Sequence, residues 1–460
     1  MQKLQIAKVF FQFFYVFLLF AAFAVIAKIF FCVIFSKNIQ LRGYYFMSGK
    51  SVVKLGIIGL GPRAETLLAS IFALPEEVEV TAICDIAEKP IEKMRGIFAR
   101  NNCPMPTVYN DHRKLLADNN VEAVLIPTGW NSHLAIARDA LAAGKYAAIE
   151  VGGAASIEEL WQIVHAAEST QVGCMMLENC CYGRNELLAM NLARKGLFGE
   201  LIHCSCGYEH DIRYELANGN VERRERDYHN LCRNGELYPT HGLGPIAKIL
   251  RINRGNRFLT LTSTASKARG FALEAEATGR GRVCYNQGDV VTTVIKCANG
   301  ETITMTHSVS LPRPYSRDCR VQGTKGLWLE ERNGIFIEGR SVTKEEIDPA
   351  GNPYFEHHWE SVEDYYAEFD HPIWRNNPVI GGHGGMDSLS LKAFFEAVRT
   401  KTQTPIDVYD IAAWMSVTCL SEQSVAMGSM PVAFPDFTNG KWVNRFDNVN
   451  SVWSLDEVIE

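Results

Sequence analysis

The segment from Lys54 to Asp85 constrains the fold more than any other part of the chain. A short apolar run at residues 52–58 is typical of a buried parallel strand and leads into Gly59-Leu60-Gly61-Pro62-Arg63-Ala64. An apolar helical stretch follows, and a second apolar run at residues 78–84 ends at Asp85. This order of strand, glycine turn, helix, strand and acid is the fingerprint of a dinucleotide-binding βαβ unit.

Each part of this fingerprint has a task. Gly59 permits the tight turn, Gly61 lets the backbone approach a pyrophosphate, and the small side chain of Ala64 lets helix and strand pack closely. The helix N-terminus offers free N–H groups to the phosphates, and Pro62 is tolerated in its first turn. Asp85 stands where an acid accepts the ribose hydroxyls. Because a carboxylate repels a ribose phosphate, the sequence predicts NAD as the cofactor and not NADP.

The rest of the chain divides into two parts that differ in their pattern of apolar and polar residues. Residues 49–178 alternate apolar strands with helices, which predicts a parallel, doubly wound sheet with right-handed crossovers. Within this stretch Asp111 is expected to cap a helix, and Ser156 with Glu159 looks like a capping box. Residues 179–460 carry a helix, then strands of alternating polarity, then two helical stretches at residues 388–400 and 409–427. We therefore predict an α/β Rossmann domain with a parallel sheet, followed by an α+β substrate domain with a mainly antiparallel sheet and C-terminal helices.

Residues 1–48 stand apart from both domains. The segment Val9–Phe35 is almost entirely apolar, with Lys3 and Lys8 before it, and it is long enough to span a bilayer. It fits an export signal or a membrane anchor. The alternative is an upstream extension that is never translated, because Met47 lies just before the first strand. The protein is membrane-anchored or exported in the first case and cytoplasmic in the second.

Composition excludes several classes of protein. The net charge of −6 and the absence of a basic stripe give no case for nucleic acid. The 13 cysteines are scattered and form no C-x-x-C pair, so the sequence predicts neither a metal site nor a redox pair. Cys180-Cys181 and the cysteines of residues 204–206 are interpreted as packed thiols. Association into a homo-oligomer is compatible with the sequence.

Ligands of parallel α/β sheets bind at the carboxyl ends of the strands. Side chains at those ends are therefore the candidates for binding NAD. They are Gly59, Gly61, Pro62, Arg63, Asp85, Trp130, Asn131, Ser132, His133, Glu150, Val151 and Asn179.

The densest polar cluster of the second half is the segment from Arg233 to Pro245. Its glycines and prolines predict a shaped loop rather than a regular element. Within it, Tyr238 and His241 are candidates for proton transfer. A second glycine-rich stretch places His383 before a helix, and the sequence does not assign its role.

Several of these stretches together resemble a known family. They are Glu178-Asn179-Cys180-Cys181-Tyr182-Gly183-Arg184, Arg233-Asn234-Gly235, Tyr238-Pro239-Thr240-His241-Gly242-Leu243-Gly244-Pro245, Ile252-Asn253-Arg254-Gly255 and His383-Gly384-Gly385-Met386-Asp387. In these sequence motifs the chain resembles glycoside hydrolase family 109, the NAD-dependent α-N-acetylgalactosaminidases. This family lies within the glucose-fructose oxidoreductase and inositol dehydrogenase (Gfo/Idh/MocA) superfamily. The resemblance covers about Lys54 to Trp442.

The resemblance implies a glycosidase that acts on a glycan or glycoconjugate with terminal α-linked N-acetylgalactosamine. It implies oxidation, elimination, addition and reduction with recycled NAD, an exception to the rule of two carboxylates. By the same resemblance, Tyr238 and His241 are the catalytic candidates, with acid and base unassigned. The implied sugar-binding residues are Tyr182, Tyr208, Arg226, Tyr238, Pro239, Thr240, His241 and Tyr315.

One departure separates the chain from the wider superfamily. Those relatives usually carry Glu-Lys-Pro where this chain has Glu150-Val151-Gly152. The missing lysine normally helps to position the substrate hydroxyl, so its absence weighs against an ordinary dehydrogenase. An NAD-dependent sugar dehydrogenase and a non-catalytic sensor of NAD and sugar remain the alternatives.

Overall fold

The computed structural model describes residues 51–217, 224–341, 346–347, 350, 353–354, 359–377, 379–445 and 451–455. The apolar segment Val9–Phe35 lies outside the described residues. Among the residues that are described, no helix is long and apolar enough to cross a membrane.

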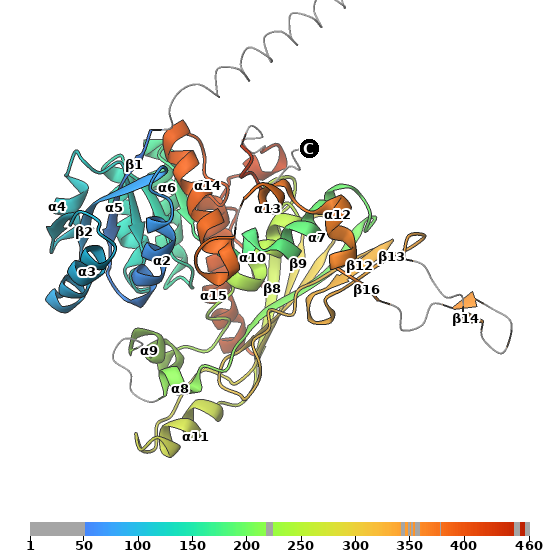
Figure 1. The fold of residues 1–460 in the computed structure, drawn as a ribbon. Coiled ribbons are helices and arrows are strands. Elements are labelled where there is room, and N and C mark those ends of the chain that lie inside the picture. Colours follow the sequence, from blue (N-terminus) through green and yellow to red (C-terminus); the bar gives the residue numbers. More distant parts are fainter. Residues whose placement is uncertain are drawn as a thin grey trace, which may run out of the picture. The chain divides into compact units, whose positions relative to one another are not determined.

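The first domain is the predicted Rossmann fold. Its six strands are all parallel and follow the order β3-β2-β1-β4-β5-β6, with helices in every connection (Figure 1). In chain order the elements are β1 (Val53–Ile58), α2 (Pro62–Phe72), β2 (Val78–Cys84), α3 (Glu88–Arg100), β3 (Thr107–Tyr109), α4 (His112–Leu116), β4 (Ala123–Ile126), α5 (His133–Ala142), β5 (Tyr146–Ile149), α6 (Ile157–Thr170) and β6 (Cys174–Met176).

Two local signals in this domain are confirmed. The Asp111 carboxylate accepts a hydrogen bond from the Arg113 N–H at the start of α4. Ser156 and Glu159 form the expected capping box at the start of α6. These caps satisfy N–H groups that a helix leaves without internal partners.

The second domain is built on a nine-stranded sheet of order β16-β13-β12-β11-β7-β10-β9-β8-β17. The pairing is antiparallel except between β7 and β10, which run parallel. The strands are β7 (Leu201–Glu209), β8 (Phe258–Ala265), β9 (Val291–Cys297), β10 (Thr302–Ser308), β11 (Arg320–Gly323), β12 (Gly326–Leu329), β13 (Gly334–Ile337), β16 (Glu360–Ser361) and β17 (Val432–Ala433); a separate pair is β14 (Glu346–Ile347) and β15 (Pro353–Tyr354).

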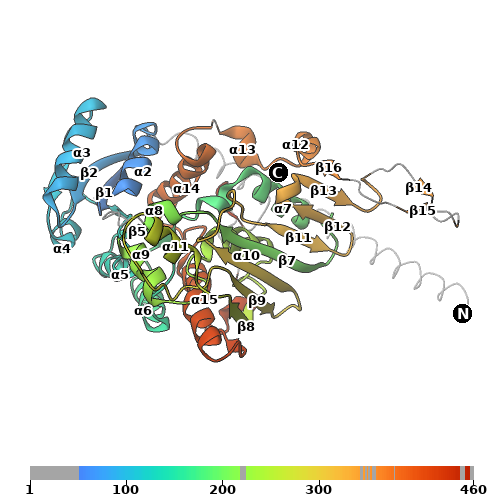
Figure 2. The same cartoon turned by 90° about the horizontal axis from the view of Figure 1, so that it is seen from below.

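Helices join the two sheets. α10 packs against β7 (Figure 2) and against the turn η1, and α15 contacts both β8 and α6. The helical elements are η1 (Asn179–Tyr182), α7 (Arg184–Arg194), α8 (Arg213–Leu216), α9 (Arg224–Cys232), α10 (Thr240–Ile249), α11 (Gly270–Ala277), η3 (Glu330–Arg332), α12 (Glu363–Phe369), α13 (Pro372–Asn376), η4 (His383–Gly385), α14 (Met386–Thr400), α15 (Val408–Ala426) and η5 (Lys441–Val443).

The segment between α14 and α15 lies along the β6 edge of the parallel sheet. The Met176 N–H donates to the Ile406 carbonyl at 3.2 Å, and the Thr404 hydroxyl donates to the Cys174 carbonyl at 2.8 Å. Tyr146 on the neighbouring strand reaches the Thr402 carbonyl. The second half of the chain therefore covers an edge of the first domain.

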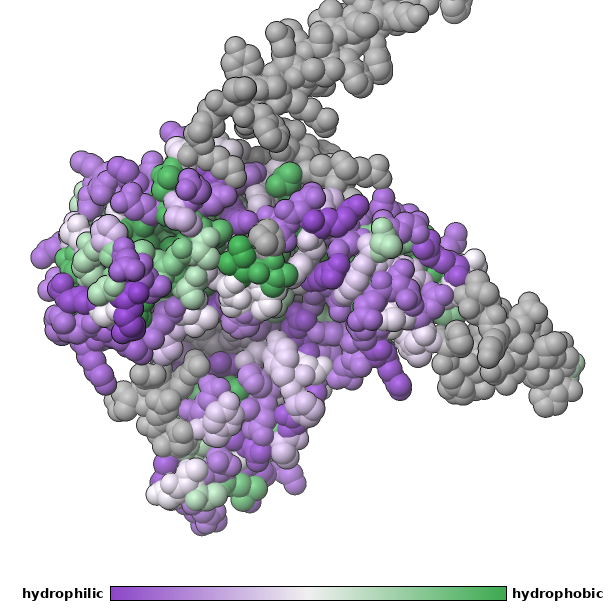
Figure 3. Space-filling model, viewed as in Figure 1, coloured by the Kyte–Doolittle hydropathy of each residue, from purple (hydrophilic) through white to green (hydrophobic). Residues whose placement is uncertain are grey.

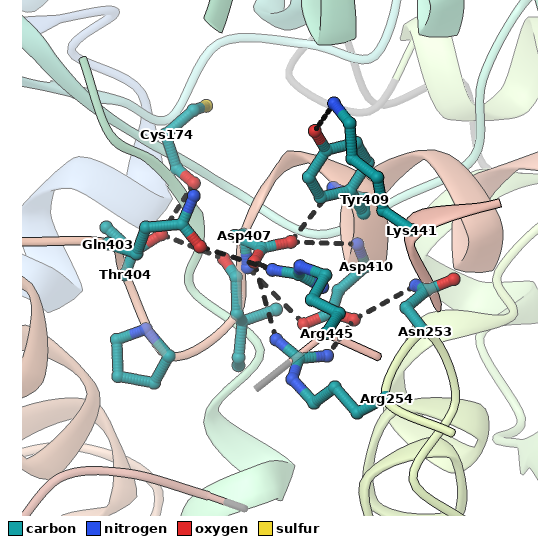
Figure 4. A network of polar contacts seen from close by, with 12 residues as sticks. Cys174, Asn253, Arg254, Gln403, Thr404, Asp407, Tyr409, Asp410, Lys441 and Arg445 are labelled. Atoms are coloured by element: carbon teal, nitrogen blue, oxygen red, sulfur yellow. Dashed lines mark hydrogen bonds and ion pairs between the residues drawn. The ribbon is translucent and has the colours of Figure 1, made fainter. Parts of the chain in front are cut away.

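A buried polar network fixes the start of α15 (Figure 4). Asp407 and Asp410 form its capping box. Asp410 also accepts hydrogen bonds from Asn253 at 3.2 Å and from Arg254 at 2.7 Å, while Arg445 pairs with Asp407. The Ile252–Gly255 stretch that supported the family resemblance therefore has a structural role, because it supplies one guanidinium and one amide to a buried helix terminus.

Candidate active site

The glycine turn has the shape that a pyrophosphate needs. Gly59 has φ +95°, and a Cβ atom there would lie 2.6 Å from Thr128 Cγ2, so a larger residue is excluded. Gly61 precedes α2, with Pro62 in the first turn. A Cβ at Gly61 would meet no atom within 4 Å, which leaves room beside the free N–H groups of the helix.

Asp85 lies directly after β2 and beside this turn. Its carboxylate accepts hydrogen bonds from the Leu60 N–H at 2.8 Å and the Ala87 N–H at 2.9 Å. The two bonds hold the carboxylate at the carboxyl end of β2, where an acid meets the ribose hydroxyls of a dinucleotide. The open cradle at Gly61 and the fixed carboxylate of Asp85 fit NAD.

Arg63 forms ion pairs with two carboxylates, a role that its position in the glycine fingerprint does not indicate. Its guanidinium donates to Glu150 Oε1 at 2.8 Å and to both oxygens of Asp387 at 2.9 and 3.0 Å. Asn179 and His383 also bind Asp387, at 2.8 and 2.9 Å. Among the predicted cofactor residues, Arg63, Glu150 and Asn179 are thus held together around one buried aspartate from the second domain.

The charge of Asp387 is stabilised by this arrangement. Burial alone raises its pKa, but the hydrogen bonds and charges of His383 and Arg63 lower it by more, so that the pKa lies well below the usual range. His383, whose role the sequence does not assign, therefore binds and orients Asp387.

The prediction of an irregular loop around Tyr238 and His241 is wrong in its second half, because α10 begins at Thr240 and continues through Pro245. The glycines serve close packing: a Cβ at Gly242 would lie 2.6 Å from the Gly207 nitrogen, and one at Gly244 would lie 2.9 Å from Glu178 Cγ. His241 is thus carried by the first turn of a rigid, buried helix.

His241 forms a close pair with Glu178, which follows β6. The distance from His241 Nδ1 to Glu178 Oε1 is 2.7 Å, and the Glu178 side chain is fully buried. Burial opposes charge on both groups and is the largest single effect, but the neighbouring charges and hydrogen bonds together outweigh it. As a result the pKa of Glu178 is lowered, and the pKa of His241 is raised well above its usual value by Cys180, Glu178 and Tyr238.

Glu178 was absent from the predicted catalytic and binding residues. The available signal was its place at the end of the strand run before Asn179. Its partner is 63 positions away in the sequence, so the pair could not be read from local spacing.

The Tyr238 hydroxyl lies 3.4 Å from His241 Nε2, on the side of the ring away from Glu178. Burial raises the pKa of Tyr238 to about 12, so the hydroxyl keeps its proton at neutral pH. Glu178, His241 and Tyr238 therefore form a continuous array of titratable groups, which is a candidate proton-handling array.

An aromatic cluster surrounds this array. The rings of Tyr208 and Tyr238 are 4.3 Å apart, and Trp130 from the first domain lies 5.7 Å from Tyr238. The Arg226 guanidinium lies 4.7 to 5.6 Å from the ring centres of Tyr238, Tyr208 and Trp130. Tyr315 contacts Tyr208 and His210 edge-on and is half exposed. Counting His241, the structure thus brings together five of the predicted sugar-binding residues and one predicted cofactor residue. In Figure 3 the surface is hollowed between the first domain and the lobe formed by α8, α9 and α11.

The remaining predicted residues have other surroundings. The side chain of Tyr182 in η1 and that of Thr240 at the start of α10 are both fully buried. Pro239 precedes α10 as its N-cap. Burial lowers the pKa of His133 to about 4, which indicates a neutral packed ring. Asn131 donates its N–H to Glu225 on α9, Ser132 binds the Gly129 carbonyl, and Val151 is buried after β5.

A Rossmann domain that fits NAD, joined to a mainly antiparallel sheet, defines the architecture of the Gfo/Idh/MocA oxidoreductases. Residues 53–178 match the "Oxidoreductase family, NAD-binding Rossmann fold" model. The fold is similar to that of levoglucosan dehydrogenase in complex with NADH and L-sorbose, with a TM-score of 0.62 at 19% identity over 84% of this chain and 100% of that chain. A scyllo-inositol dehydrogenase from Lactobacillus casei gives 0.60 at 12% identity, over 84% and 99%.

The second domain identifies the family within this superfamily. Residues 182–444 match the "Glycosyl hydrolase 109, C-terminal domain" model. An alpha-N-acetylgalactosaminidase of Tannerella forsythia is 38% identical over 431 residues, which is 86% of this chain and 89% of the relative. One of Shewanella oneidensis is 40% identical over 406 residues, 85% and 86% of the two chains. The chain belongs to glycoside hydrolase family 109, an NAD-binding family, and the resemblance stated from the sequence is confirmed.

Proposed function

We propose that this protein releases terminal α-linked N-acetylgalactosamine from glycans or glycoconjugates, with NAD as a recycled cofactor. The observation that carries the proposal is the array of Glu178, His241 and Tyr238 beside Trp130, which follows a strand of the NAD-binding sheet. The names of the relatives point to the same substrate.

The array suits an elimination better than a simple oxidation. When bound, NAD supplies the reversible oxidation at sugar carbon 3 that makes the proton on carbon 2 acidic. Removal of that proton and departure of the group on carbon 1 need a base and an acid of the protein. Because its pKa is raised, His241 holds a proton at Nε2 that it can donate, and with Nδ1–H directed to Glu178 it can then accept one back at the same nitrogen. Tyr238 also retains a proton to donate.

The apolar residue after β5 favours the same reaction. Val151 stands where dehydrogenases of the superfamily usually carry lysine, and it is buried. It can neither hold a substrate hydroxyl nor transfer a proton. The flat faces of Trp130 and Tyr208 suit contact with a sugar ring, and Arg226 can donate to the acetamido oxygen.

The test follows the purified protein with a chromogenic aryl α-N-acetylgalactosaminide in deuterated water. We expect release of the phenol, no net accumulation of NADH, and deuterium at carbon 2 of the released sugar. NADH that accumulates without phenol would identify a dehydrogenase. Binding of sugar and NAD with no turnover would identify a sensor.

We also propose that residues 9–35 attach the protein to a membrane or direct its export. The support is the length of the apolar run and its basic flank. Fractionation of native cells followed by peptide mass mapping provides the test. A cytosolic protein that begins at Met47 or Ser48 would contradict the proposal.

A further inference from the structure

The environment of His241 contains a second kind of chemistry that the proton-handling array does not use. One oxygen of Glu178, the sulfur of Cys180 and a nitrogen of His241 all lie within 4.8 Å of one another. Cys180 and Glu178 are buried, at 4% and 0% exposure, and His241 is partly buried. A carboxylate, a thiolate and an imidazole are the ligand types of zinc sites with three protein ligands.

Glu178 also has unused capacity to bind a ligand. Its Oε1 accepts hydrogen bonds from His241 and from the Cys180 N–H. The buried Oε2 has no hydrogen bond of good geometry among the described residues. The Thr240 side chain interacts with this carboxylate, and a cation on Oε2 would give the buried oxygen a stronger partner.

The three side chains need to move only a little to coordinate a metal ion. Zinc binds nitrogen, oxygen and sulfur at 2.0 to 2.3 Å, so tetrahedral ligand atoms lie roughly 3.5 Å apart. The three atoms would therefore approach or separate by about 1 Å, which side-chain rotation can provide. Glu178 and Cys180 lie on the same short turn, and His241 is on the helix packed against it.

We propose that Glu178, Cys180 and His241 form a binding site for a thiophilic divalent metal ion such as Zn²⁺, and that an ion bound there inhibits turnover. Metal binding itself is independent of the proposed glycosidase function, whereas the inhibition rests on it.

The reason for inhibition lies in the two nitrogens of His241. With Nδ1–H bound to Glu178, Nε2 is the nitrogen that can give up and take back a proton on the side of Tyr238. A metal ion on Nδ1 takes the lone pair of that nitrogen, and a neutral ring must then carry its proton on Nε2. His241 can no longer accept a proton on the side of Tyr238, and Glu178 no longer orients the ring.

Co²⁺ provides the binding test, because a thiolate ligand gives Co²⁺ a strong charge-transfer absorption in the near ultraviolet. We expect the full-length protein to develop this band with one Co²⁺ per chain, and Zn²⁺ to abolish it by displacement. Cys180→Ser should lose the band and bind Zn²⁺ at least about 100-fold more weakly, since even partners of metal ligands contribute 10- to 100-fold.

Cys181→Ser is the matched control. Cys181 is the adjacent buried cysteine, and it lies near Gly244 on α10, where a Cβ would be 3.0 Å from its sulfur. This variant should keep the band. A band that is missing in the unmodified protein, or unchanged in Cys180→Ser, would overturn the proposed site.

Measurements of turnover test the second part of the proposal, which is inhibition by the bound metal ion. Zn²⁺ should inhibit phenol release by the unmodified protein, and a chelator should restore it. Inhibition that is equally strong in Cys180→Ser would contradict the proposed role of this site. Absence of turnover in metal-free protein would contradict the glycosidase function, while the Co²⁺ spectrum would still decide whether the metal site exists.

Discussion

Arg63, in the glycine turn of the first domain, donates hydrogen bonds to both carboxylate oxygens of Asp387, 324 positions later in the chain. Asp387 is fully buried, and Arg63 is one quarter exposed. Planar bidentate pairs of this kind fix orientation as well as charge. The turn expected to bind the pyrophosphate is thus held in place by the helix α14 of the second domain.

Replacement of Asp387 by Asn should therefore destabilise the protein. Loss of one partner of a buried ion pair costs about 3–5 kcal/mol. The folded-state pKa of Asp387 is depressed, so its contribution is present above the unfolded value near 3.8 and is lost as the pH falls through the folded value. In urea titrations the difference between wild type and Asp387→Asn should be large at neutral pH and should shrink below about pH 4.

Glu79→Gln, which changes an exposed carboxylate on β2, serves as the control and should change stability by no more than about 0.5 kcal/mol. Equal stability of wild type and Asp387→Asn at pH 7 would show that the ion pair does not hold the turn.

Asp85→Ala should weaken NAD binding by about 1–3 kcal/mol, the scale of a lost hydrogen bond to a charged group. The carboxylate is already oriented by the N–H groups of Leu60 and Ala87, so it can accept from the ribose without rearrangement. Calorimetric titration with NAD measures the effect. Unchanged affinity would mean that the end of β2 does not contact the ribose.

Removal of the proton-transfer groups should leave the cofactor in place. His241→Ala and Tyr238→Phe should each reduce turnover by about 10²–10⁴, the usual contribution of a positioned acid or base, with nearly unchanged NAD affinity. Tyr228→Phe, on the exposed side of α9, is the matched control. Turnover at the wild-type rate in both test variants would remove the start of α10 from the chemistry.

Arg226→Ala should weaken sugar binding more than it slows the chemical step. The guanidinium lies over the rings of Tyr238, Tyr208 and Trp130, and such contacts contribute about 0.5–2 kcal/mol. We expect KM to rise several-fold, with a smaller change in kcat. A fall in kcat alone would instead place Arg226 in the reaction step.

The sequence predicted the fold well where the signals are local. The strands of the first domain are apolar runs, and the caps at Asp111 and Ser156 lie within three residues of the groups they bind. The parallel pairing of β7 with β10 depends on contacts far apart in the chain and was not anticipated. The glycines and Pro245 predict a loop at the start of α10, because these residues normally break helices. Only the tertiary packing shows why the helix tolerates them.

The candidate site was predictable only in part. Tyr238 and His241 stand out as titratable residues in one short stretch, whereas Tyr208, Arg226 and Tyr315 were proposed by family resemblance. The structure brings all five together. Glu178 and Asp387 gain their importance from partners 63 and 324 positions away, and neither distance is visible in local spacing or composition.

The chain that lies along β6 also limits how the protein can be divided. A sheet edge with free N–H and C=O groups invites pairing with other chains, and residues 402–406 occupy that edge here. A fragment ending near residue 178 would lose this cover and expose the short β6 strand. We expect such a fragment to aggregate, so expression of the nucleotide-binding half by itself would need the returning segment, supplied in the same polypeptide or as a peptide.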